Sequence, residues 1–400
     1  MSLADALAAI GPGELTEDTL HLHVFPLFSK TLAAPGIYLA NHSLGRPLNQ
    51  TEEDLREGFH LWQTSLGAAW GPWLEEEHAH RTRLAQLIGA SRSHCIVPKT
   101  SAGQGLRTVL NALPGIPRVV STTGEFDSID VILKQYAALG RIALQFVSCE
   151  VAEGGINLSQ LMQKIHDGVD LVVISQVMFM TGQVVPDLDL LAEHCHKAGA
   201  RLLVDAYHAV GVFSIDVARM KADFMIGGSY KYLRGGPGAA FLYISPDALS
   251  SGLKPIDIGW FAKDQPFLYD RPDPPRFAHG GDAFLESTPP ILTYYQARAG
   301  QQFALHLGVT RIRAYCIDRL SRLKRYLADV GIAAEGADDS HGGFLTIENT
   351  AAVSLAGTLE RSGITTDARG NRLRLSPDYL TSDSALREVA TTLASISAAV

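Results

Sequence analysis

Two charged residues are placed so that a carboxylate and an amine could act on the same ligand. Asp205 lies at the end of the apolar run RLLVDA (201–206), and Lys231 follows a second apolar run, ADFMIGG (222–228). Such runs are typical of strands that are buried on both faces of a parallel sheet. The carboxyl ends of parallel strands share one edge of the sheet, where α/β proteins bind ligands. We therefore expect Asp205 and Lys231 to meet at that edge.

A carboxylate and a lysine at one site match the requirements of pyridoxal 5'-phosphate. The carboxylate keeps the pyridine nitrogen protonated so that the ring accepts electrons, and the lysine forms a Schiff base with the aldehyde. Taken singly, Asp205 would be read as a turn cap and Lys231 as a residue of a solvated loop. The order Asp…Ser-Tyr-Lys in one segment, followed by a glycine-rich turn at 235–238, favours the cofactor.

The elements that must position these residues follow from the hydrophobic pattern. Short apolar runs alternate with amphipathic stretches between residues 95 and 245, which predicts βαβ units and a mainly parallel sheet. The expected strands lie within 118–122, 141–148, 170–175, 201–206, 222–228 and 239–245, and the expected helices within 127–139, 158–166 and 187–198.

The rest of the chain predicts a loop-rich stretch at 246–290 and a second domain. A helical pattern runs from Thr288 to about Asp329 with a break near Gly308, and two further helices are expected near 351–361 and 384–398. The expected division is an N-terminal segment over 1–45 that packs on the small domain, a large cofactor-binding α/β domain over 46–290, and a linking helix with a small C-terminal α+β domain over 291–400.

Composition narrows the class of protein. Of the 400 residues 46% are hydrophobic and 19% charged, which is typical of a globular chain, and the net charge of −8 argues against a nucleic-acid partner. The start of the chain lacks the pattern of a signal peptide, and no apolar run approaches a membrane span. We expect a cytoplasmic protein. The four cysteines are too widely spaced to predict a disulfide framework or a metal site: Cys95, Cys149, Cys195 and Cys316. The histidine pairs at i, i+2 do not predict a metal site either, because such residues diverge on a helix.

Two further positions suggest contacts to the cofactor. The segment Thr100-Ser101-Ala102-Gly103 places hydroxyls and small residues at the start of an expected helix that runs to about Ala112. Free N–H groups and the helix dipole favour a phosphate there, and an ordinary N-cap is the alternative. Phe126 follows an expected strand and either stacks on a ring or belongs to the core.

Several motifs together resemble one family. The segments DAYHAVG (205–211) and SYKYLRGGPG (229–238) are similar to the class V aminotransferase superfamily, and within it most similar to kynureninases. Further matching segments follow in the same order: YLANHSLG (38–45), FMTGQ (179–183), IGWF (258–261), STPPIL (287–292) and TDARGNRLRLSP (366–377). The resemblance implies fold type I of the PLP-dependent transferases, with a mainly parallel seven-stranded sheet, a small α+β domain and a homodimer that shares its active sites.

The resemblance also implies roles for individual residues. Lys231 forms the Schiff base and moves protons, Asp205 pairs with the pyridine nitrogen, and Tyr230 lies by the phosphate and donates a proton. Arg374 holds the α-carboxylate of the substrate by a two-pronged hydrogen bond. The other implied residues contact the cofactor or, for Asn41, the substrate, with Trp260 and Thr288 reaching in from the second subunit: Thr100, Ser101, Ala102, Phe126, Ser128, Ser175, His208, Trp260, Thr288 and Asn41.

Three positions depart from the kynureninase pattern, and the last two of these changes lie where the substrate side chain should sit. Ile129 stands where that family has an aspartate, Leu66 and Gly67 replace a Trp-Asn pair, and Met180 replaces a tyrosine. The expected reaction is hydrolysis of the Cβ–Cγ bond of L-kynurenine or an analogue, as in tryptophan catabolism, to L-alanine and an anthranilate-type product. The alternatives are a class V aminotransferase or epimerase acting on another amino acid, and a catalytically silent binding protein. A desulfurase is disfavoured because it requires a mobile cysteine at the site.

Overall fold

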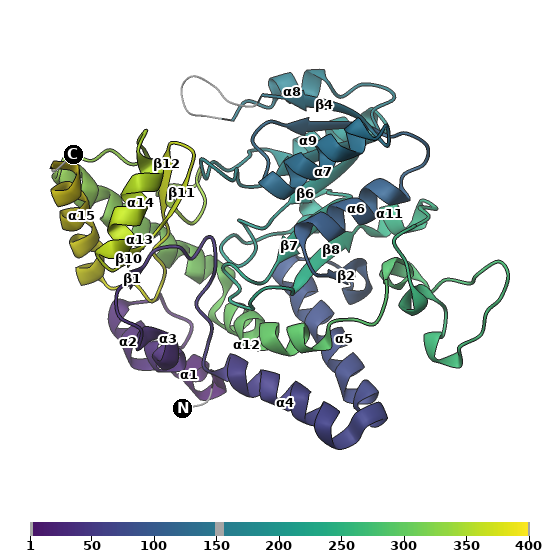
Figure 1. The fold of residues 1–400 in the computed structure, drawn as a ribbon, viewed down its shortest axis with the longest axis horizontal. Helices are drawn as coiled ribbons and strands as arrows, with labels where there is room; N and C mark the ends of the chain where they lie inside the picture. The colour runs from purple at the N-terminus through teal and green to yellow at the C-terminus, as the bar shows by residue number, and fades with distance from the viewer. Residues whose placement is uncertain (1–2, 149–155, 399–400) are drawn as a thin grey trace.

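A seven-stranded sheet forms the centre of the molecule (Figure 1). In the computed structural model, which describes residues 3–148 and 156–398, the strand order is β2-β8-β7-β6-β5-β3-β4. Only β8 runs against its neighbours β2 and β7, so the predicted α/β fold with a mainly parallel sheet is confirmed. The strands are β2 (Ile96–Lys99), β3 (Arg118–Thr122), β4 (Ala143–Val147), β5 (Leu171–Ser175), β6 (Arg201–Asp205), β7 (Phe224–Gly228) and β8 (Ala240–Ile244).

Helices cover both faces of this sheet, because alternate residues of each strand point in opposite directions. On β5, Val172 and Ile174 belong to one core, whereas Leu171 and Val173 belong to the other. One helical layer contains α5 (Trp70–Ile88), α8 (Ser159–Gln163), α9 (Leu188–Lys197), α10 (Val217–Met220) and α12 (Ile291–Leu307), and the other contains α6 (Ala102–Ala112), α7 (Asp127–Ala138) and α11 (Pro246–Ser250). Burial on both faces explains why the sequence shows unbroken apolar runs.

The C-terminal residues form a separate small α+β unit with its own core, as expected. Its antiparallel sheet has the order β11-β12-β9, and the predicted helix break occurs at Gly308, whose φ of 86° suits glycine. The elements are α13 (Val309–Asp329), β9 (Leu345–Glu348), α14 (Ala352–Arg361), β11 (Asp367–Arg369), β12 (Arg372–Leu375) and α15 (Asp383–Ala398). In Figure 1 this unit lies beside the large sheet, with α12 leading into it.

The N-terminal segment joins the two units. Strand β1 (Ile37–Tyr38) pairs in parallel with β10 (Ile364–Thr365) of the small unit. A few residues later the N–H of Gly45 donates to the backbone oxygen of Tyr230, 2.8 Å away, beside Lys231. The helices of this part are α1 (Leu3–Ile10), α2 (Glu17–His23), α3 (Ser29–Leu32) and α4 (Gln50–Ser65). The division of the chain into domains at residues 45 and 290 stays a prediction.

The loop-rich stretch forms only short helical elements after β8, among them Trp260–Ala262 and Gly280–Phe284. Within the described ranges no helix is both long and apolar enough to cross a membrane. Cys95, Cys195 and Cys316 are buried and unpaired, and Cys149 lies outside the described residues.

Helix α12 presses against the lysine segment at Gly300, and this contact yields a prediction. A Cβ atom at Gly300 would lie 1.9 Å from the backbone oxygen of Leu233. We expect Gly300→Ala to lower the free energy of unfolding by about 1–3 kcal/mol, because the segment must shift. In Gly357→Ala, the matched control in α14, the new methyl group lies 3.8 Å from the Arg361 side chain and should stabilise by up to about 1 kcal/mol. Urea denaturation measures the free energy of unfolding of both variants. Equal changes in the two variants would contradict this account.

Candidate active site

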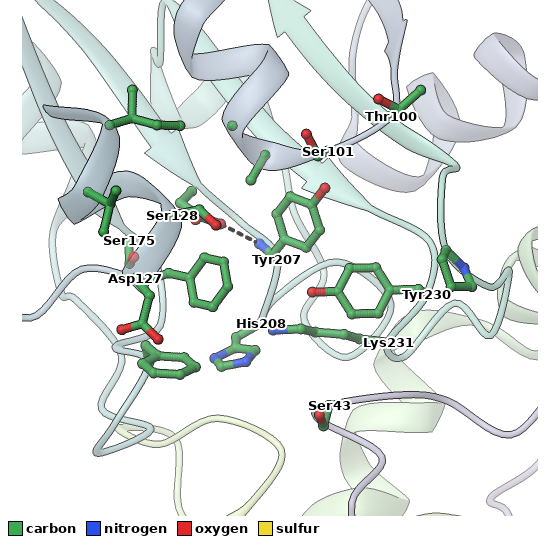
Figure 2. A pocket seen from close by; sticks show the side chains of 18 of the residues that line it. Ser43, Thr100, Ser101, Asp127, Ser128, Ser175, Tyr207, His208, Tyr230 and Lys231 are labelled. Carbon is green, nitrogen blue, oxygen red and sulfur yellow. Dashed lines mark hydrogen bonds between the residues drawn. The ribbon is translucent and has the colours of Figure 1, made fainter. Parts of the chain in front are cut away.

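The carboxyl ends of the parallel strands open into a cavity of about 760 Å³ (Figure 2). Asp205 ends β6, Ser175 ends the neighbouring β5, and Lys231 follows the end of β7 by three residues. The cavity wall includes most of the predicted cofactor residues: Thr100, Ser101, Ala102, Phe126, Ser128, Ser175, Asp205, His208, Tyr230 and Lys231. The sheet edge therefore brings together residues that are up to 131 positions apart, from Thr100 to Lys231.

The central feature of the cavity is a buried amine and a buried carboxyl group. Asp205 and Lys231 are only 4% and 6% exposed to solvent. Burial lowers the pKa of Lys231 to about 7, although the Asp205 carboxylate opposes this shift. Burial likewise raises the pKa of Asp205 to about 6, against the effects of the Tyr207 N–H and of Lys231. A lysine in this setting has a large fraction of neutral, reactive amine at physiological pH.

The groups around the pair have unused hydrogen-bonding capacity. Among the described residues the carboxylate of Asp205 accepts one hydrogen bond, from the Tyr207 N–H at 2.9 Å, which leaves its other oxygen for a ligand. The Nε2 atom of His208 is buried and has no partner within residues 3–148 and 156–398, and the His208 ring stacks on Phe179 with centroids 6.0 Å apart. In Figure 2 the Lys231 side chain extends toward His208, with Tyr230 alongside it. These polar atoms fit a bound pyridoxal phosphate, whose ring nitrogen and oxygen need such partners.

The start of α6 lies at the opposite side of the cavity from Ser43 (Figure 2) and has the features of an anion cradle. Ser101 is the N-cap, and its Oγ accepts from the Gln104 N–H at 3.2 Å. The N-cap that was the alternative is therefore present, and it does not exclude a phosphate at the helix start, where N–H groups lack intrahelical partners. Gly103 leaves the start of the helix open, and a Cβ there would lie 2.9 Å from the end of the Ile132 side chain. A phosphate fits this cradle.

Four predicted residues do not line this cavity: Asn41, Trp260, Thr288 and Arg374. The Asn41 amide donates to the backbone oxygen of Ser376 at 2.7 Å. Trp260 and Thr288 bind each other, Nε1 to Oγ1 at 3.3 Å, away from the Lys231 cavity of the same chain.

Arg374 is 1% exposed and already engaged. One of its Nη atoms pairs with Asp367 and the other donates to the backbone oxygen of Phe179 at 2.7 Å, whereas its Nε is buried without a partner. The guanidinium of Arg374 thus connects β11 and β12 of the small unit to the segment that follows β5 of the large sheet.

Sequence reasoning missed Glu125. The Glu125 carboxyl accepts hydrogen bonds from Thr122 and Ser175, each at 2.6 Å, and burial raises its pKa to about 7. Its position three residues after the expected strand 118–122 and directly before Phe126 was the one available signal. Ile129 is fully buried in the core, and Asp127 lines the cavity instead. The acidic side chain has therefore moved two residues toward the N-terminus.

Comparison with known proteins identifies the family. Residues 74–376 match the family model "Aminotransferase class-V". A Bacillus subtilis (strain 168) protein named "Uncharacterized aminotransferase YcbU" is 27% identical over 86% of this chain and 89% of its own length. A kynureninase of Bacillus thuringiensis subsp. konkukian is 26% identical over 85% of this chain and 83% of its own. A Pseudomonas fluorescens kynureninase is 27% identical over 66% of this chain and 64% of its own.

Solved structures confirm the fold. The apo cysteine desulfurase of Thermococcus onnurineus NA1 superposes with a TM-score of 0.83 at 19% identity, over 97% of this chain and 100% of that one. A C-DES variant with glycine covalently linked to its PLP cofactor gives a TM-score of 0.83 at 20% identity, over 92% and 98% of the two chains. Because the family model spans about three quarters of the sequence, the chain belongs to the class V aminotransferase family of pyridoxal-phosphate-dependent enzymes.

Proposed function

We propose that this enzyme is a hydrolase of the kynureninase type, which cleaves the Cβ–Cγ bond of L-kynurenine or a close analogue. The observation that carries the proposal is the buried Asp205–Lys231 pair in a cavity whose wall also includes apolar side chains. Leu44, Val131 and Ile132 contribute apolar surface that suits an aryl side chain. The relatives named kynureninase support the choice of reaction.

Each group of residues has a distinct task in this proposal. Lys231 would hold the cofactor and would take the proton from the substrate Cα. Asp205 keeps the ring nitrogen protonated, while Thr100, Ser101 and Ala102 hold the phosphate. The bound cofactor supplies the electron sink for the bond cleavage. The remaining cofactor contacts are assigned to Phe126, Ser128, Ser175, His208 and Tyr230.

Arg374 is assigned to the α-carboxylate of the substrate. The hydrogen bond from Nη1 to the Phe179 oxygen is the one that a carboxylate would replace. The ion pair with Asp367 keeps the guanidinium plane fixed during this exchange. Asn41 secures the adjacent backbone at Ser376 and so acts on the substrate indirectly.

A homodimer with shared active sites is part of the proposal. Trp62 and Leu66 are 53% and 68% exposed and line an apolar surface groove together with Thr288. Trp260 bonds to Thr288 and packs near Trp70 of the same groove. An exposed apolar area of this kind favours a protein contact. We assign it to the second subunit, whose cofactor cavity Trp260 and Thr288 would complete.

An aminotransferase is the second candidate. The changed positions Leu66 and Met180 and the relative named aminotransferase favour it. Desulfuration has less support: Cys95, Cys195 and Cys316 are buried and do not line the cavity, and burial raises the pKa of the Cys316 thiol to about 11.

The first prediction concerns turnover. The holoenzyme is expected to release anthranilate, measured by fluorescence, and one equivalent of alanine from L-kynurenine. Lys231→Ala should lower kcat by roughly 10²–10⁴-fold, because the Cα proton loses its acceptor. Lys134→Ala, which removes an exposed lysine on α7, is the matched control and should retain the wild-type rate. Conversion of the bound cofactor to its amine form without anthranilate would contradict the hydrolase and indicate the aminotransferase.

The second prediction concerns the Lys231 amine in the apoprotein. Only the neutral amine reacts with acetic anhydride, so a pKa of about 7 predicts that its labelling rate levels off above neutral pH. The exposed Lys221, whose pKa is raised by its hydrogen bond to Glu193, should still gain reactivity at alkaline pH. Trace labelling with peptide mass spectrometry measures both. A Lys231 profile that rises in parallel with that of Lys221 would refute the lowered pKa.

The third prediction tests the shared site. Lys231→Ala and the double variant Trp260→Ala/Thr288→Ala should each be nearly inactive alone. Mixing equal amounts under subunit exchange should restore about one quarter of wild-type activity, because half of the dimers are hybrids with one intact site. Absence of recovery in a mixture shown to contain hybrid dimers would contradict the sharing of residues.

A further inference from the structure

A buried carboxyl group lies behind the cavity wall and has no task in the reaction proposed above. Glu125, between β3 and α7, is 6% exposed. Its two oxygens accept hydrogen bonds from Thr122 Oγ1 and Ser175 Oγ, each at 2.6 Å. Among the described ion pairs none involves Glu125, so an ionised carboxylate would be balanced only by the Thr122 and Ser175 hydroxyls and the Ser175 backbone. Such a group is held close to the point where it gains or loses a proton.

The two protonation states of Glu125 demand different orientations of the Ser175 hydroxyl. A carboxylate only accepts hydrogen bonds, so Ser175 must then donate to it and present lone pairs to the cavity. A carboxylic acid with its proton on Oε2, the oxygen that faces Ser175, can donate to the Ser175 oxygen and release the seryl proton. Ser175 lines the cavity and pairs in register with Asp205 on the adjacent strand. Its orientation therefore changes the hydrogen bonding available to a ligand beside Asp205.

We propose that Glu125 is a positioning residue whose proton sets the direction of the Ser175 hydroxyl toward the bound cofactor. The proposal rests on the placement of the cofactor in this cavity. With Glu125 protonated, the wall offers a donor to the cofactor; with Glu125 ionised, the wall offers an acceptor and adds a negative charge to the site.

The charges that face Glu125 determine how the two states couple to the cofactor. Thr122 on β3 and Ser175 on β5 are neutral, and Asp205 on β6 is the charged group that disfavours ionisation of Glu125. A protonated ring nitrogen at Asp205 offsets that repulsion and favours ionised Glu125. By reciprocity, ionised Glu125 stabilises positive charge on the cofactor and on the nitrogen that joins it to Lys231.

The first test is a pH titration of the visible absorbance of the holoenzyme. Glu125→Gln keeps the side-chain shape but cannot ionise, so the midpoint of the band should fall by roughly half a unit to one unit. Ser121→Ala is the matched control: it removes another buried hydroxyl of β3, which donates to the backbone oxygen of Val173, and should leave the midpoint unchanged. A normal band with an unshifted midpoint in Glu125→Gln would overturn the proposal. A wild-type protein without the band would instead contradict the cofactor placement itself.

The second test does not require that Glu125→Gln folds. Ser175→Ala removes the hydroxyl that changes direction, and the dissociation constant of pyridoxal phosphate is measured for this variant and the wild type at pH 6 and pH 8.5. Because the wall donates only while Glu125 is protonated, the loss of affinity should be about five-fold greater at the lower pH. An equal loss at both pH values would overturn the proposal, since the hydroxyl would then keep one orientation.

Discussion

The structure depends on holding a lysine amine and a carboxylate together where water hardly reaches them. Lys231 and Asp205 are 6% and 4% exposed, and removing such groups from water is costly unless each compensates the other. Two neighbouring parallel strands place the two groups together. Strand β6 ends at Asp205, and the chain after β7 turns so that Lys231 lies over the same edge of the sheet. The same burial that makes the pair costly shifts both pKa values toward neutrality, where the amine can act as a nucleophile and as a base.

The lysine segment is held from two sides, which keeps the amine in register with the cavity. A Cβ atom at Gly45 would lie 2.0 Å from the Lys231 backbone oxygen, and one at Gly300 would lie 1.9 Å from that of Leu233. Both glycines thus permit backbone contacts that no other residue allows. Three residues after Lys231, the buried Arg234 forms an ion pair with Asp378 of the small unit. The N-terminal segment, α12 and the small unit all meet at the residues that follow the lysine.

Much of this architecture could be predicted from the sequence because its signals are local. Buried strands give unbroken apolar runs, and Asp205 and Lys231 are marked by the ends of such runs. Strand β2 was missed because its four residues IVPK are short and end in a buried lysine, Lys99, which pairs with Glu286. Glu125 was missed because a single acid after a strand gives no periodic signal. The pairing of Arg374 with Asp367 depends on the register of two strands, which local patterns do not report.

The central claim is that Lys231 carries the cofactor, and reduction of the holoenzyme with borohydride tests it most directly. Reduction fixes the bond between pyridoxal phosphate and the amine, and peptide mass spectrometry then locates the modified residue. The account predicts a pyridoxyl group on Lys231 and none in the Lys231→Ala variant. Lys99 is the informative alternative, because it is also buried and directly precedes the phosphate cradle at Thr100. Modification of Lys99, or of any lysine other than Lys231, would contradict the account.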